Sequence, residues 1–300
     1  MFIFTKLINK IRKIIYISRS RKISKLLINI LDEEKINIVD IGAGQRYLPT
    51  LLNFDGVAKI AMVDPNKNLE WSYNNFINLI KFKENVKKFK FAIGGRTEKV
   101  KYYETRRSTG STLVNIYKRN NKINNEYFGE KNEKKIQAYS FDDFIKKFFL
   151  KKTDIVKIDV EGHEEKIITS ILRNQNPYLI EIELNINNRI YDNTFNKVHK
   201  ILTKRKYKLV TGCPLYRNDA NPNDPFVLGS YHEPIYRAPL EQLDSIYIKD
   251  DNRQNLKILA ILIGYGFIIE AKSIFDNLNI RSKKIKYKII NNFFKKEFNL

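Results

Sequence analysis

The first part of the chain, residues 2–31, has the hydrophobic periodicity of one helix. Apolar side chains return every three or four positions, and lysines and arginines fill many of the positions between them, which is typical of an amphipathic helix. The clearest apolar positions are Leu7, Ile11, Ile14 and Ile17. We predict a basic helical extension over residues 1–34, broken near Ser18 and Ser20. Its isoleucine face either docks on the protein core or binds a membrane surface.

From about residue 35 to residue 250, short apolar runs alternate with helical segments. The predicted strands cover 37–41, 58–63, 90–93, 100–103, 154–159, 178–184, 207–210 and 245–248. The predicted helices follow Arg46 and Asn66 and cover 141–149, 163–172 and 194–203. This alternation predicts an α/β fold with a doubly wound, Rossmann-like parallel sheet and helices on both of its faces. Such sheets bind their ligands at the carboxyl ends of the strands.

The last third of the chain departs from this alternation. Residues 213–239 hold most of the prolines, together with many Asn and Asp residues, and we predict a loop insertion there. From residue 252 the pattern is helical and rich in lysine. The predicted organisation is therefore one domain over residues 35–250, followed by a second basic helical extension over residues 251–300.

Composition adds a question about partners. Hydrophobic residues make up 43% of the chain, enough for a sizeable core, and the formal net charge is +22. Such a charge suits nucleic acid, an anionic membrane or a phosphorylated substrate. Lysine is abundant in every segment, however, so a merely solvated basic surface explains the charge equally well. The oligomeric state is not indicated by the sequence.

Cysteine usage and hydropathy bear on location. The single cysteine, Cys213, cannot form an internal disulfide. The longest uncharged apolar run, Ile258 to Ile269, is shorter than the ~20 residues that a membrane-spanning helix needs. We expect a cytoplasmic protein, and peripheral contact with the inner face of the membrane through the basic end helices is the alternative.

The first predicted strand ends in a glycine turn, Asp40-Ile41-Gly42-Ala43-Gly44. About 20 residues later Asp64 stands at the end of the second strand, where a carboxylate can accept hydrogen bonds from ribose hydroxyls. The third glycine of a dinucleotide motif is replaced by Tyr47, which disfavours a bound pyrophosphate. Asp40 suits the cationic amino-acid end of S-adenosylmethionine. An ordinary tight turn is the alternative interpretation of these glycines.

A second polar block follows the strand predicted at 154–159. Asp159 and Glu161 stand at its carboxyl end, Gly162 permits a sharp turn, and a helix follows. Glu181 and Glu183 share one face of the next strand. Carboxylates in apolar strands need a reason, because an unpaired buried charge is costly. For Asp159 and Glu161 the reason is either a catalytic role or capping of the N–H groups at the start of the following helix.

The segment Ile155 to Glu164, Ile-Val-Lys-Ile-Asp-Val-Glu-Gly-His-Glu, resembles the signature of FkbM-type S-adenosylmethionine-dependent methyltransferases. Other segments resemble further motifs of that family in the same order, over residues 36 to about 210. They are 39–44, 63–66, 91–94 with 111–113, and 140–144. The resemblance implies a methyltransferase sheet that binds S-adenosylmethionine. Asp40, Gly42, Gly44 and Asp64 would hold this cofactor, with Ser111 added on resemblance alone.

The resemblance also implies O-methylation of a sugar or another hydroxyl, in glycan or natural-product biosynthesis. A hydroxyl is a poor nucleophile at neutral pH, so a base or a metal ion would help. Asp159 and Glu161 are the candidate catalytic residues, with His163 as the alternative base. A metal held by Asp159 and Glu183 is a lesser alternative. Arg106 and Arg107 are candidates for binding an anionic acceptor through charge-assisted hydrogen bonds.

Several features keep other functions open. Arg46 stands where the family usually has a glycine close to the cofactor, so a degenerate fold acting as a scaffold or membrane-surface protein is an alternative. A nucleic-acid methyltransferase is disfavoured, because Asp159-Val160-Glu161-Gly162 replaces the motif that receives a flipped base. We therefore expect a small-molecule or glycan acceptor and no nucleic acid. A dehydrogenase is disfavoured by the missing third glycine.

Overall fold

The computed structural model describes most of the chain. Its described residues are 2–44, 49–104, 113, 132–148, 152–160, 162–186, 194–216, 240–250, 255–278 and 284–298. Four residues singled out from the sequence lie outside them: Arg46, Arg106, Arg107 and Tyr47. Two candidate site residues, Ser111 and Glu161, lie outside them as well, as does most of the predicted loop insertion.

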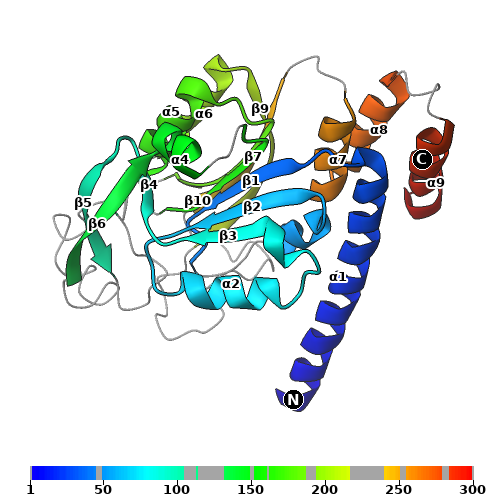
Figure 1. Ribbon diagram of the computed structural model, residues 1–300, viewed down its shortest axis with the longest axis horizontal. Helices are drawn as coiled ribbons and strands as arrows, with labels where there is room; N and C mark the ends of the chain where they lie inside the picture. Colours follow the sequence, from blue (N-terminus) through cyan, green and yellow to red (C-terminus); the bar gives the residue numbers. More distant parts are fainter. Residues whose placement is uncertain are drawn as a thin grey trace.

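The core of the molecule is a seven-stranded sheet in the order β3-β2-β1-β7-β8-β10-β9 (Figure 1). Its strands are β1 (Ile36–Ile41), β2 (Ala58–Val63), β3 (Val86–Phe89), β7 (Ile155–Ile158), β8 (Leu179–Asn185), β9 (Tyr207–Tyr216) and β10 (Leu240–Lys249). The α/β prediction is confirmed, but the sheet is mixed rather than parallel, because β10 runs antiparallel to both β8 and β9. Consecutive strands that pair directly are antiparallel without a crossover. The predicted loop thus begins no earlier than residue 217.

A second sheet of three strands stands beside the first, in the order β4-β6-β5. Its strands are β4 (Ala92–Gly94), β5 (Glu98–Glu104) and β6 (Asn132–Ser140). The strand predicted at 90–93 is wrong in its bounds, since the chain passes from β3 in the main sheet to β4 in the small one. No strand was predicted at β6. Its residues 134 and 135 are exposed lysines, so the strand lacks the apolar alternation that reveals a buried face.

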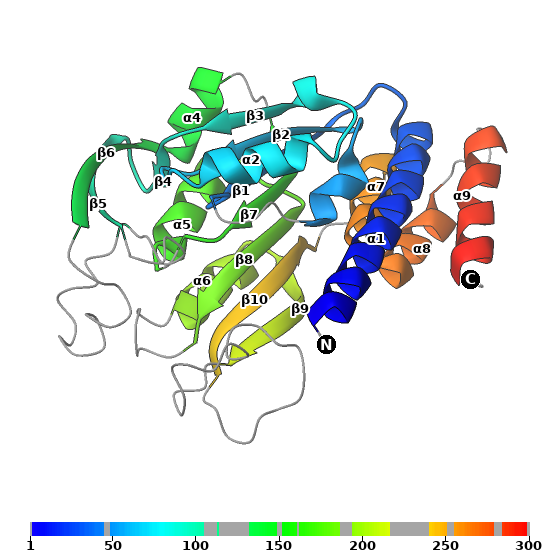
Figure 2. The ribbon, with the colours of Figure 1, turned by 90° about the horizontal axis from the view of Figure 1, so that it is seen from below.

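Helices cover both faces of the main sheet (Figures 1 and 2). On one face lie α4 (Phe141–Phe148), α5 (Glu164–Asn174) and α6 (Thr194–Lys204). On the other lie α2 (Leu69–Ile77) and the short 3-10 helix η1 (Pro49–Phe54), which stands where we predicted a helix after Arg46. A second 3-10 turn, η2, covers Lys83–Asn85. Successive strand residues point to opposite faces, so each strand feeds both cores and is apolar along most of its length.

The predicted helices at both ends of the chain are confirmed. They are α1 (Phe2–Leu31) and, at the other end, α7 (Leu256–Tyr265), α8 (Ile268–Asn277) and α9 (Lys284–Phe298). The predicted break near Ser18 and Ser20 is wrong, because α1 is continuous. Ser20 is buried and fits within the helix. Ser24, one turn later, donates a 2.6 Å hydrogen bond to the carbonyl of Asp55. Within the described residues, no helix is both long and apolar enough to cross a membrane.

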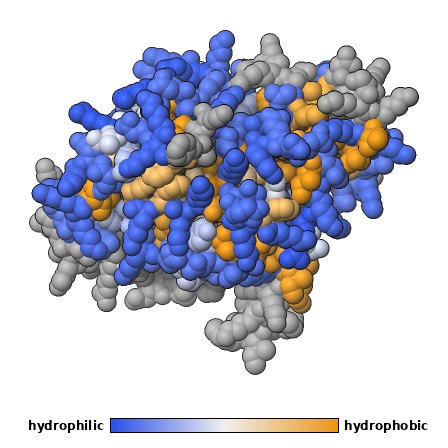
Figure 3. Space-filling model, viewed as in Figure 1, coloured by the Kyte–Doolittle hydropathy of each residue, from blue (hydrophilic) through white to orange (hydrophobic). Residues whose placement is uncertain are grey.

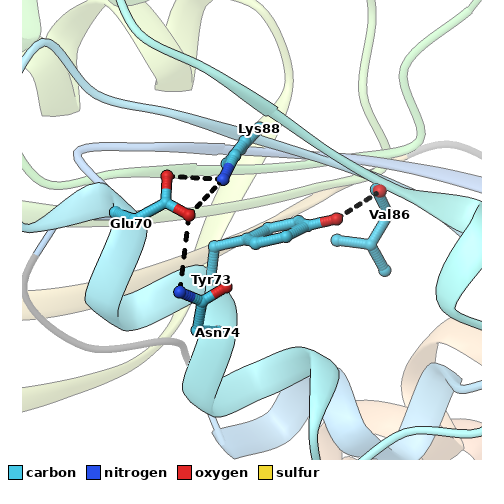
Figure 4. A network of polar contacts seen from close by, with 5 residues as sticks. All are labelled: Glu70, Tyr73, Asn74, Val86 and Lys88. Carbon is cyan, nitrogen blue, oxygen red and sulfur yellow. Dashed lines mark hydrogen bonds and ion pairs between the residues drawn. The ribbon is translucent and has the colours of Figure 1, made fainter.

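The outer strand β3 is tied to α2 by a small polar network (Figure 4). Glu70 forms an ion pair with Lys88, whose ammonium lies 4.7 Å from the centre of the Tyr73 ring. The Tyr73 hydroxyl donates a 3.5 Å hydrogen bond to the carbonyl of Val86. These contacts hold the strand whose last residue, Phe89, accepts a 3.1 Å hydrogen bond from the backbone N–H of Asp64. They therefore help to place the carboxyl edge of the sheet.

Candidate active site

The carboxyl ends of β3, β2, β1 and β7 meet around a cavity of about 50 Å³. Its lining residues are Ile41, Gly42, Val63, Asp64, Pro65, Phe91, Ala92, Ile93, Tyr102, Leu113, Asp159 and Val160. The location is where an α/β sheet of this kind binds ligands. Three of the residues singled out from the sequence, Gly42, Asp64 and Asp159, lie on its wall.

Gly42 allows two neighbouring strand ends to touch. Its φ is +88°, a conformation that favours glycine, and a Cβ atom at this position would lie 1.7 Å from the carbonyl oxygen of Asp159. The backbone N–H of Asp159 donates a 2.9 Å hydrogen bond to the carbonyl of Ile41 just before it. The ends of β1 and β7 are therefore in direct backbone contact, and this contact brings Asp159 to the cavity.

Gly44 has a similar relation to Asp64. A Cβ atom on Gly44 would lie 2.6 Å from Asp64 Oδ2, whereas its N–H donates a 2.8 Å hydrogen bond to that oxygen. The N–H of Asn66 donates to Oδ1 at 2.7 Å. Burial raises the pKa of Asp64 to about 6, although these two N–H donors oppose the shift. Each carboxylate oxygen keeps a further lone pair for a ligand hydroxyl.

Asp40 does not reach the cavity. It is fully buried, and its register partner on β7 is Lys157, which in turn lies beside Glu181 on β8. These three side chains share the face of the sheet that also packs α1 and α7. The Lys157 ammonium lies 3.4 Å from Asp40 Oδ1 and 3.2 Å from Asp159 Oδ2. Lys157 thus links the buried carboxylate to the one on the cavity wall.

The charges of this row shift one another. Burial raises the pKa of Asp40, and the attraction of Lys157 opposes that rise. Burial would lower the pKa of Lys157, but Asp159, Asp40 and Glu181 outweigh burial and hold it above its ordinary value. Burial also raises the pKa of Glu181 to about 7. The single ammonium of Lys157 therefore attracts at least three carboxylates, those of Asp40, Asp159 and Glu181.

The next row holds Glu183 and Asp244, which are register partners on β8 and β10. Burial raises the pKa of Asp244 to about 6, and the charge of Asp159 acts in the same direction. In the part of the chain that the structure describes, no group of three or more His, Cys, Asp or Glu side chains is arranged to hold a metal ion. The alternative of a metal between Asp159 and Glu183 gains no support from these residues.

The turn from β7 into α5 carries the remaining candidates. The buried Glu164 accepts a 2.6 Å hydrogen bond from the N–H of Gly162, so among the described residues it is Glu164, and not Asp159, that binds an N–H at this helix start. Burial raises the pKa of Glu164 to about 7. His163 immediately precedes the helix. Burial and the neighbouring Lys166 lower the pKa of His163 to about 4, so its imidazole is uncharged at neutral pH.

An open groove of about 660 Å³ lies between the small sheet and α5. Its lining residues are Gly94, Gly95, Arg96, Glu98, Val100, Lys101, Tyr103, Leu113, Ala138, His163, Glu165, Lys166, Thr169 and Arg173. Leu113 lines both the groove and the cavity at the sheet edge. The two spaces are therefore neighbours, with Asp159 on the cavity wall and His163 on the groove wall.

A comparison with protein-family profiles points to the same part of the chain as the cavity and the groove. The sequence profile of the Methyltransferase FkbM domain matches residues 40–209, more than half of the chain. The chain belongs to the FkbM methyltransferase family. The matched region begins at the end of β1 and ends in β9, so it contains every candidate site residue. A search of curated proteins finds no match.

Solved structures similar to this chain include other methyltransferases. The FkbM methyltransferase of Methylobacillus flagellatus KT is 14% identical with a TM-score of 0.39, covering 71% of this chain and 43% of that one, so the chain spans less than half of this relative. TrmK of M. capricolum in complex with S-adenosylhomocysteine is 14% identical with a TM-score of 0.36, covering 88% and 92%. The 1,6-didemethyltoxoflavin-N1-methyltransferase of Burkholderia thailandensis, also with S-adenosylhomocysteine, is 13% identical with a TM-score of 0.36, covering 77% and 78%.

The cofactor of this FkbM domain is S-adenosylmethionine, and the described residues fit it. Asp64 presents a carboxylate with free acceptor capacity at the end of β2, and Gly42 leaves no side chain between the strands and a ligand. The cavity of about 50 Å³ is smaller than the roughly 300 Å³ of ordinary ligand pockets, so the cofactor must also occupy space beyond it.

Six of the eight candidate residues are described, and they fall into three places. Gly42, Asp64 and Asp159 line the cavity, with Gly44 against Asp64. Asp40 lies behind the wall, and His163 lies in the groove. Sequence reasoning missed Lys157 and Glu164, although both stand inside the signature segment. The register of β7 against β1 shows the role of Lys157, and that register is visible only in the fold.

Proposed function

We propose that the FkbM domain transfers the methyl group of S-adenosylmethionine to a hydroxyl of a sugar or of another small molecule or glycan bound in the groove. The observation that supports this proposal is the meeting of cavity and groove at Leu113. On the cofactor side stands a carboxylate fixed by a lysine, and on the groove side an uncharged imidazole. Alignment of two reactants is the main task of such a transferase.

In the proposed mechanism, the domain positions the cofactor and removes the proton of the acceptor. Asp64 would hold the ribose hydroxyls of the cofactor, and Asp159, held by Lys157, would attract its positive charge. S-adenosylmethionine, when bound, would supply the methyl group from its sulfonium, whose S–C electron pair would stay on sulfur as the acceptor oxygen takes the methyl carbon. His163 accepts the hydroxyl proton through its free ring nitrogen and returns it to water.

The charges in the groove favour an acceptor with negative charge. Lys101 pairs with Glu133 at 2.8 Å, and Glu165 pairs with Lys197 at 3.3 Å. Three further cations of the groove, Arg96, Lys166 and Arg173, have no ion pair within the described residues. A carboxylate or phosphate on the acceptor would supply that pair. Uronic acids and sugar phosphates are the corresponding acceptor classes.

The test is an acceptor screen with methyl-labelled S-adenosylmethionine. The panel holds neutral monosaccharides, uronic acids and sugar phosphates, each beside its deoxy analogue, and calorimetry with S-adenosylhomocysteine measures the cofactor site separately. We expect label transfer to hydroxyl-bearing acceptors only. Transfer that is equal for each sugar and all of its deoxy analogues would contradict O-methylation. Tight cofactor binding without transfer to any member would favour the scaffold interpretation.

Two variants assign the proton acceptor once an acceptor is found. We expect His163→Gln to lower kcat by roughly 10²- to 10⁴-fold with little change in cofactor affinity. Asp159→Asn should weaken cofactor binding as well as turnover. If His163→Gln keeps full activity while Asp159→Asn loses it, the base is Asp159 and the proposed role of His163 is wrong.

A further inference from the structure

Helix α1 has two apolar faces that point in different directions. Its C-terminal half is part of the core, with Leu27 fully buried and Leu31 nearly so. In its N-terminal half, Ile11, Ile14 and Ile15 are 47%, 58% and 62% exposed. At 3.6 residues per turn, Ile11 points about 160° away from Leu27. These three isoleucines, which we call the outer stripe, therefore lie on the side opposite the docked face.

The same helix carries only positive charge. Its basic residues are Lys6, Lys10, Arg12, Lys13, Arg19, Arg21, Lys22 and Lys25, and it has no Asp or Glu between Phe2 and Leu31. Lys13, Arg19, Arg21, Lys22 and Lys25 form no ion pair with any described residue. A groove of about 450 Å³ begins at Ile14 of the stripe and continues toward the C-terminal half of the helix, lined by Ile14, Ile17, Ser18, Arg21, Lys22 and Lys25. Apolar and cationic groups thus occupy one surface.

This surface stands clear of the rest of the molecule. The N-terminal half of α1 extends beyond the sheet and the other helices in Figure 1, and hydrophobic surface is visible on the coloured part of this half in Figure 3. No described helix packs against the outer stripe, since its isoleucines remain about half exposed. Isolated exposed isoleucines are ordinary, but three in one stripe among unpaired cations form a contiguous site.

The positive charge of α1 indicates what kind of partner binds this surface. A second copy of the chain would bring its own acid-free helix to the contact, and the like charges would repel. An anionic bilayer offers negative headgroups for the cations and an apolar layer for the isoleucines at the same depth. We propose that the N-terminal half of α1 binds an anionic membrane surface, with the outer stripe inserted among the lipids.

The test is co-sedimentation of the full chain with two kinds of vesicle, phosphatidylcholine alone and phosphatidylcholine mixed with phosphatidylglycerol. We expect binding to the mixed vesicles only, and loss of that binding in high salt, because headgroup attraction is screened. Equal binding to both kinds of vesicle, or no binding to either, would overturn the proposal.

Matched variants test the surface itself. Ile14→Asp combined with Ile15→Asp should lower vesicle binding by roughly tenfold or more, whereas Ile269→Asp, at a still more exposed isoleucine of α8, should leave it unchanged. Lys13→Glu should weaken binding by roughly tenfold, and Lys87→Glu on the outer strand β3 should not. All five substituted positions are exposed, so circular dichroism should show unchanged folding. Equal effects of the test and control variants would contradict a site on α1, and self-association through the stripe would assign it to a second copy.

Discussion

The edge of the sheet that we propose as the cofactor site and the neighbouring groove are built in different ways. At the edge, backbone touches backbone, and the space left at Gly42 and Gly44 is smaller than a methyl group. In the groove, long side chains from the small sheet and from α5 line an open volume of about 660 Å³. The first arrangement permits almost no substitution, whereas the second permits many. Cofactor binding should therefore be sensitive to single atoms, and acceptor choice to the overall charge.

The largest effect is expected for Gly42→Ala. The added Cβ would meet the carbonyl of Asp159, and the positive φ adds strain, so we expect a loss of roughly 3 kcal/mol or more of stability and no measurable cofactor binding. Thermal unfolding and calorimetry with S-adenosylhomocysteine measure both. Gly266→Ala is the matched control. It has a φ of +84° but nothing within 4 Å of the new atom, and should cost only the backbone strain of about 1 kcal/mol. Similar losses in both would mean that the contact with Asp159 is unimportant.

Lys157→Met tests the buried charges behind the edge. Removing the ammonium leaves Asp40 fully buried without a cation, which should cost about 3–5 kcal/mol in urea unfolding at neutral pH. Adding Asp40→Asn should recover much of that loss, because the uncompensated charge is gone. If the double variant is no more stable than the single one, Lys157 acts mainly through Asp159 or Glu181.

Acidification should weaken cofactor binding through Asp64. Its folded pKa of about 6 is above its ordinary 3.8, so the free domain takes up a proton as the pH falls through 6. The proton must leave before the carboxylate can bind the ribose, so affinity for S-adenosylhomocysteine should fall by up to about tenfold per pH unit below 6. The same raised pKa means that the stability contributed by this group is present below 3.8 and is lost as the pH rises through 6. Asp64→Asn should bind weakly with a flatter pH profile, and an unchanged profile would assign the titration to another group.

Substitution in the groove should have a smaller and more selective effect. Burial lowers the pKa of His163 and Lys166 adds to that shift, so Lys166→Ala should raise this pKa in part and move the acid limb of the rate profile to higher pH. Cofactor affinity should stay within about twofold of the unsubstituted protein, because Lys166 does not line the cavity. A parallel loss of cofactor affinity would show that groove and cavity are not separable.

The smallest effect is expected for Glu70→Gln, in the polar network that ties α2 to β3. Glu70 and Lys88 form an exposed ion pair, and exposed pairs contribute little. We expect no measurable change in melting temperature or in cofactor affinity. A clear loss of affinity would show that the network of Figure 4 positions Asp64 more strongly than its exposure suggests.

The contrast between edge and groove also explains what could be predicted from the sequence. The strands around Asp40 and Asp159 are short, apolar and followed by glycine, so pattern and motif together predicted strand ends that the fold brings to one edge. The groove depends on β6, whose lysines interrupt the apolar alternation that would predict a strand. It also depends on packing between β5 and α5, which about 60 residues separate along the chain. The pairing of Lys157 with Asp40 needed the strand register. Features set by the local sequence could be predicted, and contacts set by tertiary packing could not.

One feature of the core bears on how the protein is made. Asn53 in η1 donates a 2.7 Å hydrogen bond to the carbonyl of Gly264 in α7, and Leu27 of α1 shares a core with Leu259. More than two hundred residues separate these partners along the chain. A ribosome must therefore deliver α7 before the face that includes α1 can close. Until then the apolar side of α1 can pack only in part, against η1 and the first strands, so the helix completes its burial late in synthesis.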